Sequence, residues 1–163
     1  MDIKILFEDE FKDYGASGEI LFEENDAALD YGLTNLVLAS LFTDKRAFPD
    51  DEIPDGTTKR RGWWGDTVSD TEDDTIGSRL WLLSRSKTTN DVLNKAKGFI
   101  DEALEWMVED GLVAEIEVTT ERIFYASDGN YTLGAQIDLR RESGENISIN
   151  FKDLWDGQFD IAS

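Results

Sequence analysis

The fold is decided by residues 91–111, which read DVLNKAKGFIDEALEWMVEDG. Apolar residues recur in this stretch at the spacing of one helical face: Val92, Ala96, Phe99, Ala103 and Met107, with Leu93, Ile100 and Leu104 widening the stripe. Thr88 is the expected N-cap, because Asp91 follows three residues later as in a variant of the capping box. Gly111 is well placed as the C′ residue that ends a helix. The pattern predicts a long amphipathic helix over Asp91–Asp110.

The residues that follow this helix show the two-residue period of β-strands. Ala114, Ile116 and Val118 alternate with polar residues, which is typical of a half-buried strand. Ser127-Asp128-Gly129-Asn130 separates the β-prone ranges Ile123–Ala126 and Tyr131–Leu139, so it predicts a hairpin. In the second range one set of side chains points the same way: Leu133, Ala135, Ile137 and Leu139. Another turn, Ser143-Gly144, precedes the alternating residues Ile147, Ile149 and Phe151.

The chain before the long helix carries shorter elements. We expect short strands at Ile3–Phe7 and Glu19–Phe22, a helix at Leu33–Phe42, a loop over Ala47–Thr58 and a short helix at Ile76–Arg85. Helices that precede an antiparallel meander indicate the α+β class. The sequence therefore predicts a single α+β domain over residues 1–163, with an N-terminal strand and helices, one long central amphipathic helix, and a C-terminal antiparallel β meander.

The composition excludes several classes of function. The 163 residues include 36 acidic and 16 basic side chains and neither His nor Cys, so the formal net charge is −20. Without His and Cys the chain has no Ser-His-Asp triad, no thiolate nucleophile and no cysteine zinc site. The charge argues against nucleic acid or an anionic membrane as a ligand, and no apolar stretch is long enough to span a membrane. We expect no catalytic residues, no cofactor and no metal, since the acidic run Asp70–Asp74 lacks the EF-hand pattern.

Residues 60–66, which read RRGWWGD, form the least ordinary phrase of the sequence. Trp and Arg are the residues most enriched at binding hot spots, so this phrase could contact a partner protein. In the alternative interpretation both indole rings cover the edge of the core and the arginines pair with nearby acids. A buried Arg79, paired bidentately with Asp66 or Asp44, would fix the shape of the loop under either interpretation. The candidate partner-binding residues are Arg60, Arg61, Trp63, Trp64, Asp66 and Arg79.

Several phrases together resemble the gene product 46 family of Mu-like phages and prophages. They are Leu41–Ala47, Arg61–Asp66, Gly77–Leu83, Ala103–Trp106 with Glu109–Gly111, and Phe151–Trp155. The outline is more remotely similar to the T4-type baseplate wedge family, the sheath-initiator class, with Thr43–Arg46 in place of that family's Gly-Glu-Arg turn. The resemblance implies a structural part of a contractile tail baseplate rather than an enzyme.

The same resemblance implies the partners and the location. The expected partners are other baseplate wedge proteins, with tail sheath or tube proteins as further candidates, in a symmetric assembly. The expected location is the virion tail baseplate, assembled in the host cytoplasm. The opening Met1–Ile5 agrees, because it lacks the basic region and apolar run of a signal peptide.

Two other functions stay open at this point. A carboxylate-based cell-wall hydrolase of the lysozyme kind would need two carboxyl groups about 5 to 10 Å apart across a cleft. An acidic inhibitor that mimics DNA would need carboxylates arrayed along a surface, at about one charge per 1.7 Å of duplex axis.

Overall fold

A computed structural model of the chain describes residues 2–4, 21–23, 26–62, 76–127, 129–155 and 158–162. The chain divides into two compact units, Met1–Leu38 and Ala39–Ser163. Helix α1 (Asp26–Phe42) crosses the boundary between them. A single domain over residues 1–163 stays a prediction.

In the first unit, strands β1 (Asp2–Lys4) and β2 (Leu21–Glu23) pair antiparallel, with Ile3 opposite Phe22. Residues 5–7 of the first expected strand lie outside the described residues. Helix α1 begins at Asp26 and not at Leu33 as expected. The extension is physically reasonable, because the helix-forming pair Ala27-Ala28 lies within it.

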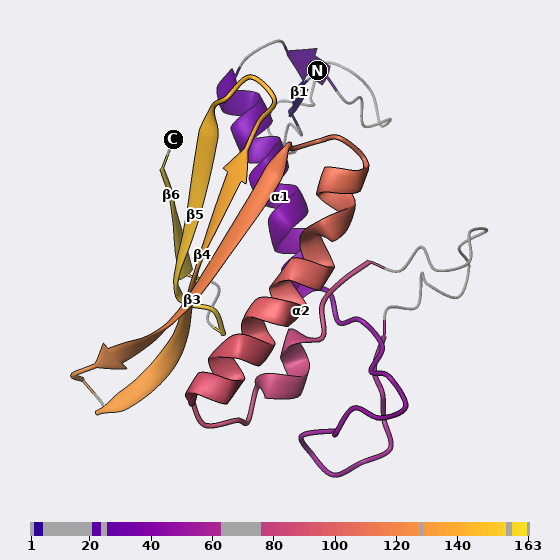
Figure 1. Cartoon of the computed structure of the whole chain (residues 1–163), viewed down its shortest axis with the longest axis vertical. Helices are drawn as coiled ribbons and strands as arrows, with labels where there is room; N and C mark the ends of the chain where they lie inside the picture. The colour runs from indigo at the N-terminus through magenta and orange to yellow at the C-terminus, as the bar shows by residue number, and fades with distance from the viewer. Residues whose placement is uncertain are drawn as a thin grey trace, which may run out of the picture. The chain divides into compact units, whose positions relative to one another are not determined.

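The second unit consists of helical segments followed by an antiparallel meander, as Figure 1 shows. Its elements are η3 (Leu80–Leu83), α2 (Asn90–Glu109), β3 (Glu115–Tyr125), β4 (Asn130–Arg140), β5 (Asn146–Asp153) and β6 (Gln158–Ala162). The four strands form one sheet in the order β3-β4-β5-β6, and every neighbouring pair is antiparallel. Helix α2 lies against β3, where the Thr120 hydroxyl donates to the carbonyl of Leu93 at 3.1 Å. The α+β prediction is confirmed.

The core of this unit lies between α2 and the sheet. Register places Val118 opposite Ile137, and Ile137 opposite Ile149, so apolar side chains of three strands meet on one face. The buried apolar residues of α2 and the sheet are Ala96, Ile100, Ala103, Leu104, Met107, Val118, Leu133, Ala135, Ile137, Leu139, Ile147, Ile149 and Phe151. The predicted alternation is therefore confirmed in β4 and β5 and at Val118 of β3, whereas Ala114 precedes β3 and is exposed.

The ends of α2 correct one prediction and confirm another. The N-cap is Thr89, whose hydroxyl accepts from the amide of Val92 at 3.4 Å, while Thr88 donates instead to the carbonyl of Tyr131. At the other end Gly111 has φ +72°, and Leu112 donates to the carbonyl of Met107 at 2.9 Å. That arrangement is a Schellman motif, which explains why the helix stops there.

Two further features of the sheet differ from expectation. Strand β3 is continuous from Glu115 to Tyr125, where the sequence predicted two separate pieces. Strand β6 was not predicted; it pairs with β5 on both sides of an irregularity between Phe151 and Asp153. The β3–β4 hairpin extends past β5 in Figure 1, because β5 pairs with β4 only from Ala135 onward.

Candidate functional site

A backbone clip joins the end of α1 to the segment before η3. Ser78 donates its amide to the carbonyl of Thr43 at 2.9 Å, and the amide of Lys45 donates to the carbonyl of Ser78 at 3.0 Å. The buried Ser78 hydroxyl also donates to the carbonyl of Leu41 at 2.6 Å. Gly77 permits this approach, since it has φ +113° and a Cβ there would lie 2.4 Å from the carbonyl oxygen of Thr43. The clip places Arg79 beneath the loop that follows Lys45.

Arg79 is the centre of a cluster that we call the arginine cluster: Lys45, Phe48, Asp51, Arg79, Phe99 and Glu102. The Arg79 Nη1 atom lies 3.1 and 3.0 Å from the two carboxylate oxygens of Asp51, and its Nη2 atom lies 2.6 Å from Glu102 Oε2. Its guanidinium carbon is 4.0 Å from the ring centre of Phe48 and 4.7 Å from that of Phe99. The side chain is only 13% exposed. The internal pairing predicted for Arg79 is therefore present, although the partner is not Asp44.

The cluster stabilises its own charges. Burial acts to raise the pKa of the Glu102 carboxyl, but hydrogen bonds from Arg79 and Lys45 outweigh it and leave the pKa below its ordinary value of 4.5. The Lys45 ammonium is 2.9 Å from Glu102 Oε1. Burial likewise acts to lower the pKa of Arg79, and hydrogen bonds to Glu102 and Asp51 reverse the effect and raise it. Both charged forms are favoured in the folded protein.

This pKa shift makes the stability of the protein depend on pH. Because the pKa of Glu102 is lower in the folded than in the unfolded chain, the stabilisation is complete above 4.5 and is lost as the pH falls through the folded pKa. We expect the free energy of unfolding of the wild type, relative to Glu102→Gln, to fall as the pH drops below 4.5 and through the folded pKa of Glu102. Urea unfolding across that range measures the difference. A difference that stays constant with pH would contradict the assignment.

Two predicted site residues, Arg60 and Arg61, form hydrogen bonds with the segment that follows α1. Arg60 donates through Nη2 to the carbonyl of Pro49 at 2.8 Å and through Nη1 to that of Phe48. The Arg61 Nη1 atom lies 2.9 Å from Asp44 Oδ2, and its guanidinium carbon lies 4.6 Å from the ring centre of the buried Trp81. Arg61 is half exposed, so part of its guanidinium stays accessible.

The remaining predicted site residues, Trp63, Trp64 and Asp66, lie outside the described residues. Sequence reasoning missed three side chains of the cluster, Phe48, Asp51 and Glu102, as contacts of Arg79. One signal was available for Glu102, because its spacing from Phe99 places both on the same side of α2. Nothing in the sequence pattern distinguishes Asp51 from the other acids of its loop.

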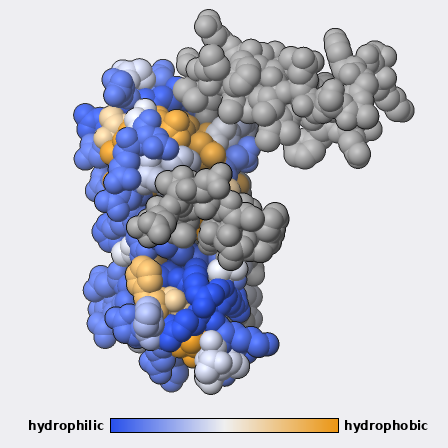
Figure 2. Space-filling model, turned by 90° about the vertical axis from the view of Figure 1, so that its right-hand side faces the viewer, coloured by the Kyte–Doolittle hydropathy of each residue, from blue (hydrophilic) through white to orange (hydrophobic). Residues whose placement is uncertain are grey.

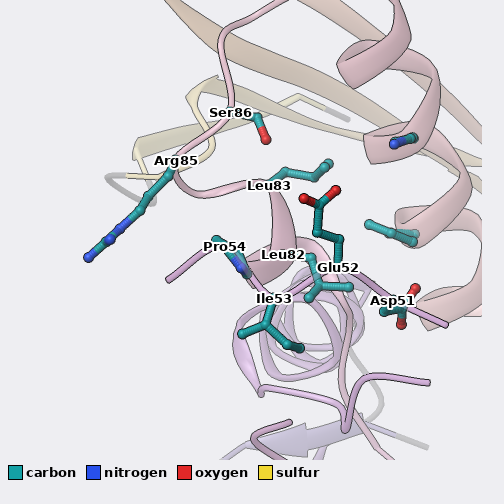
Figure 3. A pocket seen from close by; sticks show the side chains of 10 residues that line it. Asp51, Glu52, Ile53, Pro54, Leu82, Leu83, Arg85 and Ser86 are labelled. Carbon is teal, nitrogen blue, oxygen red and sulfur yellow. The ribbon is translucent and has the colours of Figure 1, made fainter. Parts of the chain in front are cut away.

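A pocket of about 470 Å³ lies beside the cluster, and Figure 3 shows it from close by. Its walls come from the loop at Asp51–Pro54, from the end of η3 and the residues after it, and from α2. Leu82 and Phe99 provide apolar lining, and Arg85 and Lys95 provide positive charge. In the lower part of Figure 2, apolar surface likewise lies directly beside strongly hydrophilic surface. Such a combination suits the recognition of another protein.

Two carboxyl groups of the described residues have pKa values below their ordinary range. Asp55 and Glu102 are both lowered, whereas a general acid needs a raised pKa. Asp51, at the pocket, already binds Arg79. Within the described ranges no three acidic side chains are placed to hold a metal ion, and no helix is long and apolar enough to cross a membrane.

Comparisons with known proteins give a consistent family. The family model described as phage protein GP46 matches residues 33–146, which include the clip and the arginine cluster. Baseplate protein gp46 of Escherichia phage Mu is 43% identical over 140 residues, covering 86% of this chain and 91% of the relative. Mu-like prophage FluMu protein gp46 of Haemophilus influenzae is 34% identical over 105 residues, covering 64% of this chain and 69% of the relative.

Proposed function

We propose, because the chain belongs to the phage protein GP46 family, that it is a structural component of the baseplate of a contractile phage tail. The observation that carries the proposal is the similarity to the Mu protein named as a baseplate protein, which extends over 86% of this chain. The protein then acts by binding its neighbours and not by catalysis. Its place is the baseplate of the virion, and its assembly takes place in the host cytoplasm.

The partners follow from that role. They are other baseplate wedge proteins, with tail sheath or tube proteins as further candidates. The net charge of −20 favours basic surfaces on these partners, and it keeps free subunits apart until such surfaces meet them. Repetition around a symmetric ring lets modest individual contacts add up through avidity.

The docking surface that we propose includes Arg60, Arg61, Trp63, Trp64 and Asp66. Support comes from the loop that leads into this stretch, because hydrogen bonds from Arg60 and the clip at Thr43 hold that loop in one conformation. A preorganised loop loses less conformational entropy when it binds. In this proposal Arg79 has a positioning role, since its guanidinium is enclosed by Phe48, Phe99 and two carboxylates.

Replacing Trp63 and Trp64 together by Ala tests the docking surface. We expect the double variant to keep the thermal unfolding transition of the wild type and to lose at least about tenfold in affinity for co-expressed baseplate proteins, because truncating hot-spot aromatics costs about 2 kcal/mol or more. Co-purification from cells that express the tail genes measures the effect.

The matched control is Trp155→Ala, which removes an exposed indole at the other end of the chain. This control is expected to co-purify as the wild type does. If the double variant loses its unfolding transition, the two rings belong to the core and the docking proposal is wrong. Unchanged co-purification of the double variant would also contradict it.

A further inference from the structure

Part of the lining of the pocket beside the arginine cluster is apolar. Leu82 and Leu83 come from η3, Phe99 from α2, and Ile53 from the loop opposite. The two leucines are buried, and Ile53 and Phe99 are partly buried. In Figure 3 the side chain of Leu83 lies on the opposite side of the opening from Ile53 and Pro54. A volume of about 470 Å³ is enough for one or two large side chains of a partner.

Two cations line the same pocket, and they differ from the other cations near it. Lys45 and Arg79 bind carboxylates in the arginine cluster. Arg85 and Lys95, by contrast, make no hydrogen bond or salt bridge with any residue of the described ranges, and both are exposed. After the hydrogen bonds of Thr57, the charge of Arg85 helps to lower the pKa of Asp55. In a chain with 36 acids, two cations without such a partner beside apolar lining indicate a site for a carboxylate.

We propose that this pocket binds an acidic apolar segment of a neighbouring baseplate protein. A large apolar side chain of the segment contacts Leu82, Leu83 and Phe99, and a carboxylate next to it binds Arg85 and Lys95. The inference rests on the proposed function, since it names the chemistry of one neighbour. The pocket is then a second binding surface, in addition to the Arg60–Asp66 stretch. It binds an acidic segment, whereas the net charge of the chain favours basic partners.

Glu52 determines how such a segment is oriented. Its carboxylate also lines the pocket, on the loop side, and Figure 3 shows it pointing into the opening. A bound carboxylate is repelled by Glu52 and attracted by Arg85 and Lys95. The acidic residue of the segment therefore lies toward the two cations, and its apolar residue lies deeper. Removal of the Glu52 charge is expected to tighten binding.

Titration of the full chain with short peptides tests the proposal. The probe is acetyl-Gly-Asp-Phe-Gly-amide, followed by amide chemical shifts of the isotopically labelled protein. We expect shifts at residues that line the pocket, and about tenfold weaker binding of the matched peptide in which Asn replaces Asp. A peptide in which Ala replaces Phe is expected to lose binding as well. Equal binding of the Asp and Asn peptides, or shifts confined to another surface, would overturn the proposal.

Charge variants make the test specific to the pocket. Arg85→Glu and Lys95→Glu are each expected to weaken the Asp peptide about tenfold, and Glu52→Gln to bind it more tightly. The control is Lys97→Glu, which changes the same charge on α2 at a residue that pairs with Asp101 and does not line the pocket. If Lys97→Glu weakens binding equally, only general charge attracts the peptide and the proposal is wrong.

A second copy of this chain is the rival occupant. Sedimentation of the wild type and of Arg85→Glu distinguishes it, because a self-filled pocket requires a dimer that the variant disrupts, and that result would overturn the proposal. The proposed function fails separately, if the wild type itself does not co-purify with the tail proteins. Peptide binding alongside that failure would leave the chemistry of the pocket assigned and the baseplate role rejected.

Discussion

Replacing Gly77 by Ala is expected to destabilise the second unit by about 3 to 5 kcal/mol. The backbone of Gly77 has φ +113°, a conformation that costs an L-residue about 1 to 3 kcal/mol. The added Cβ would also lie 2.4 Å from the carbonyl oxygen of Thr43 and 3.1 Å from the amide nitrogen of Lys45. These contacts are with backbone atoms, which cannot rotate away. Relief therefore requires that the two hydrogen bonds of the clip lengthen or break, at about 1 kcal/mol each.

The matched control is the same substitution at Gly98. Gly98 lies within α2, and a Cβ added there meets nothing within 4 Å. Ala is the better helix former, so Gly98→Ala is expected to stabilise the protein by about 1 kcal/mol. Urea unfolding followed by circular dichroism measures both variants. The two substitutions add the same methyl group and are expected to change the free energy of unfolding in opposite directions. A loss below about 1 kcal/mol in Gly77→Ala would show that the clip is not as tight as described.

The elements that the sequence predicted well are those whose signal is periodic. Helix α2 repeats its apolar residues over about four turns from Val92 to Met107, and its C-terminus follows from Gly111 alone. The alternation at Leu133–Leu139 likewise predicted which side of β4 is buried. In each case burial of one face dominates the local free energy, so the residue pattern is sufficient. The N-cap was displaced by one residue because Thr88 and Thr89 have equal intrinsic preference for that position.

The elements and contacts that were not predicted differ in their cause. Strand β6 had a signal in the sequence, because Asp156-Gly157 is typical of a hairpin turn and Phe159 and Ile161 alternate with polar residues after it. The partner of Arg79 could have been any of several acids, and its choice of Asp51 and Glu102 follows from where the clip places the loop. Gly77 and Ser78 belong to the Gly77–Leu83 phrase that resembles the family. Their role in the clip follows from the close approach of Thr43, which the sequence alone does not show. A single sequence carries no signal for such an approach.

Arg79→Met is expected to cost about 2 to 4 kcal/mol of unfolding free energy, the second of the two large effects. Methionine keeps an unbranched apolar stem but removes the guanidinium, so the loss includes the ion pairs and the stacking of that group on Phe48 and Phe99. Asp51 would lose both hydrogen bonds from Arg79, and Glu102 would keep only Lys45. Removal of one partner of a buried pair costs about 3 to 5 kcal/mol, and the 29% exposure of Glu102 reduces that figure through solvent screening.

The control for this prediction is Arg140→Met, which removes an ion pair of similar length. Arg140 lies 3.0 Å from Glu115, but the two side chains are 60% and 64% exposed, so the expected cost is under about 1 kcal/mol. A double-mutant cycle of Arg79→Met with Glu102→Gln is expected to show strong coupling, because the second change removes the carboxylate that the first leaves underpaired. Additive losses would contradict the shared network.

Variants of Arg79 decide between the two roles considered for it. As a positioning residue it acts through the loop, so Arg79→Lys, which keeps the charge and loses the fork that reaches two carboxylates, should lose stability, and co-purification should weaken only in parallel with that loss. As a docking residue it would contact the partner directly, and Arg79→Met would then lose co-purification while its unfolding free energy stayed near that of the wild type. The enclosure of the guanidinium by two rings and two carboxylates favours the first outcome, because a group with four internal partners has little left to offer a neighbour.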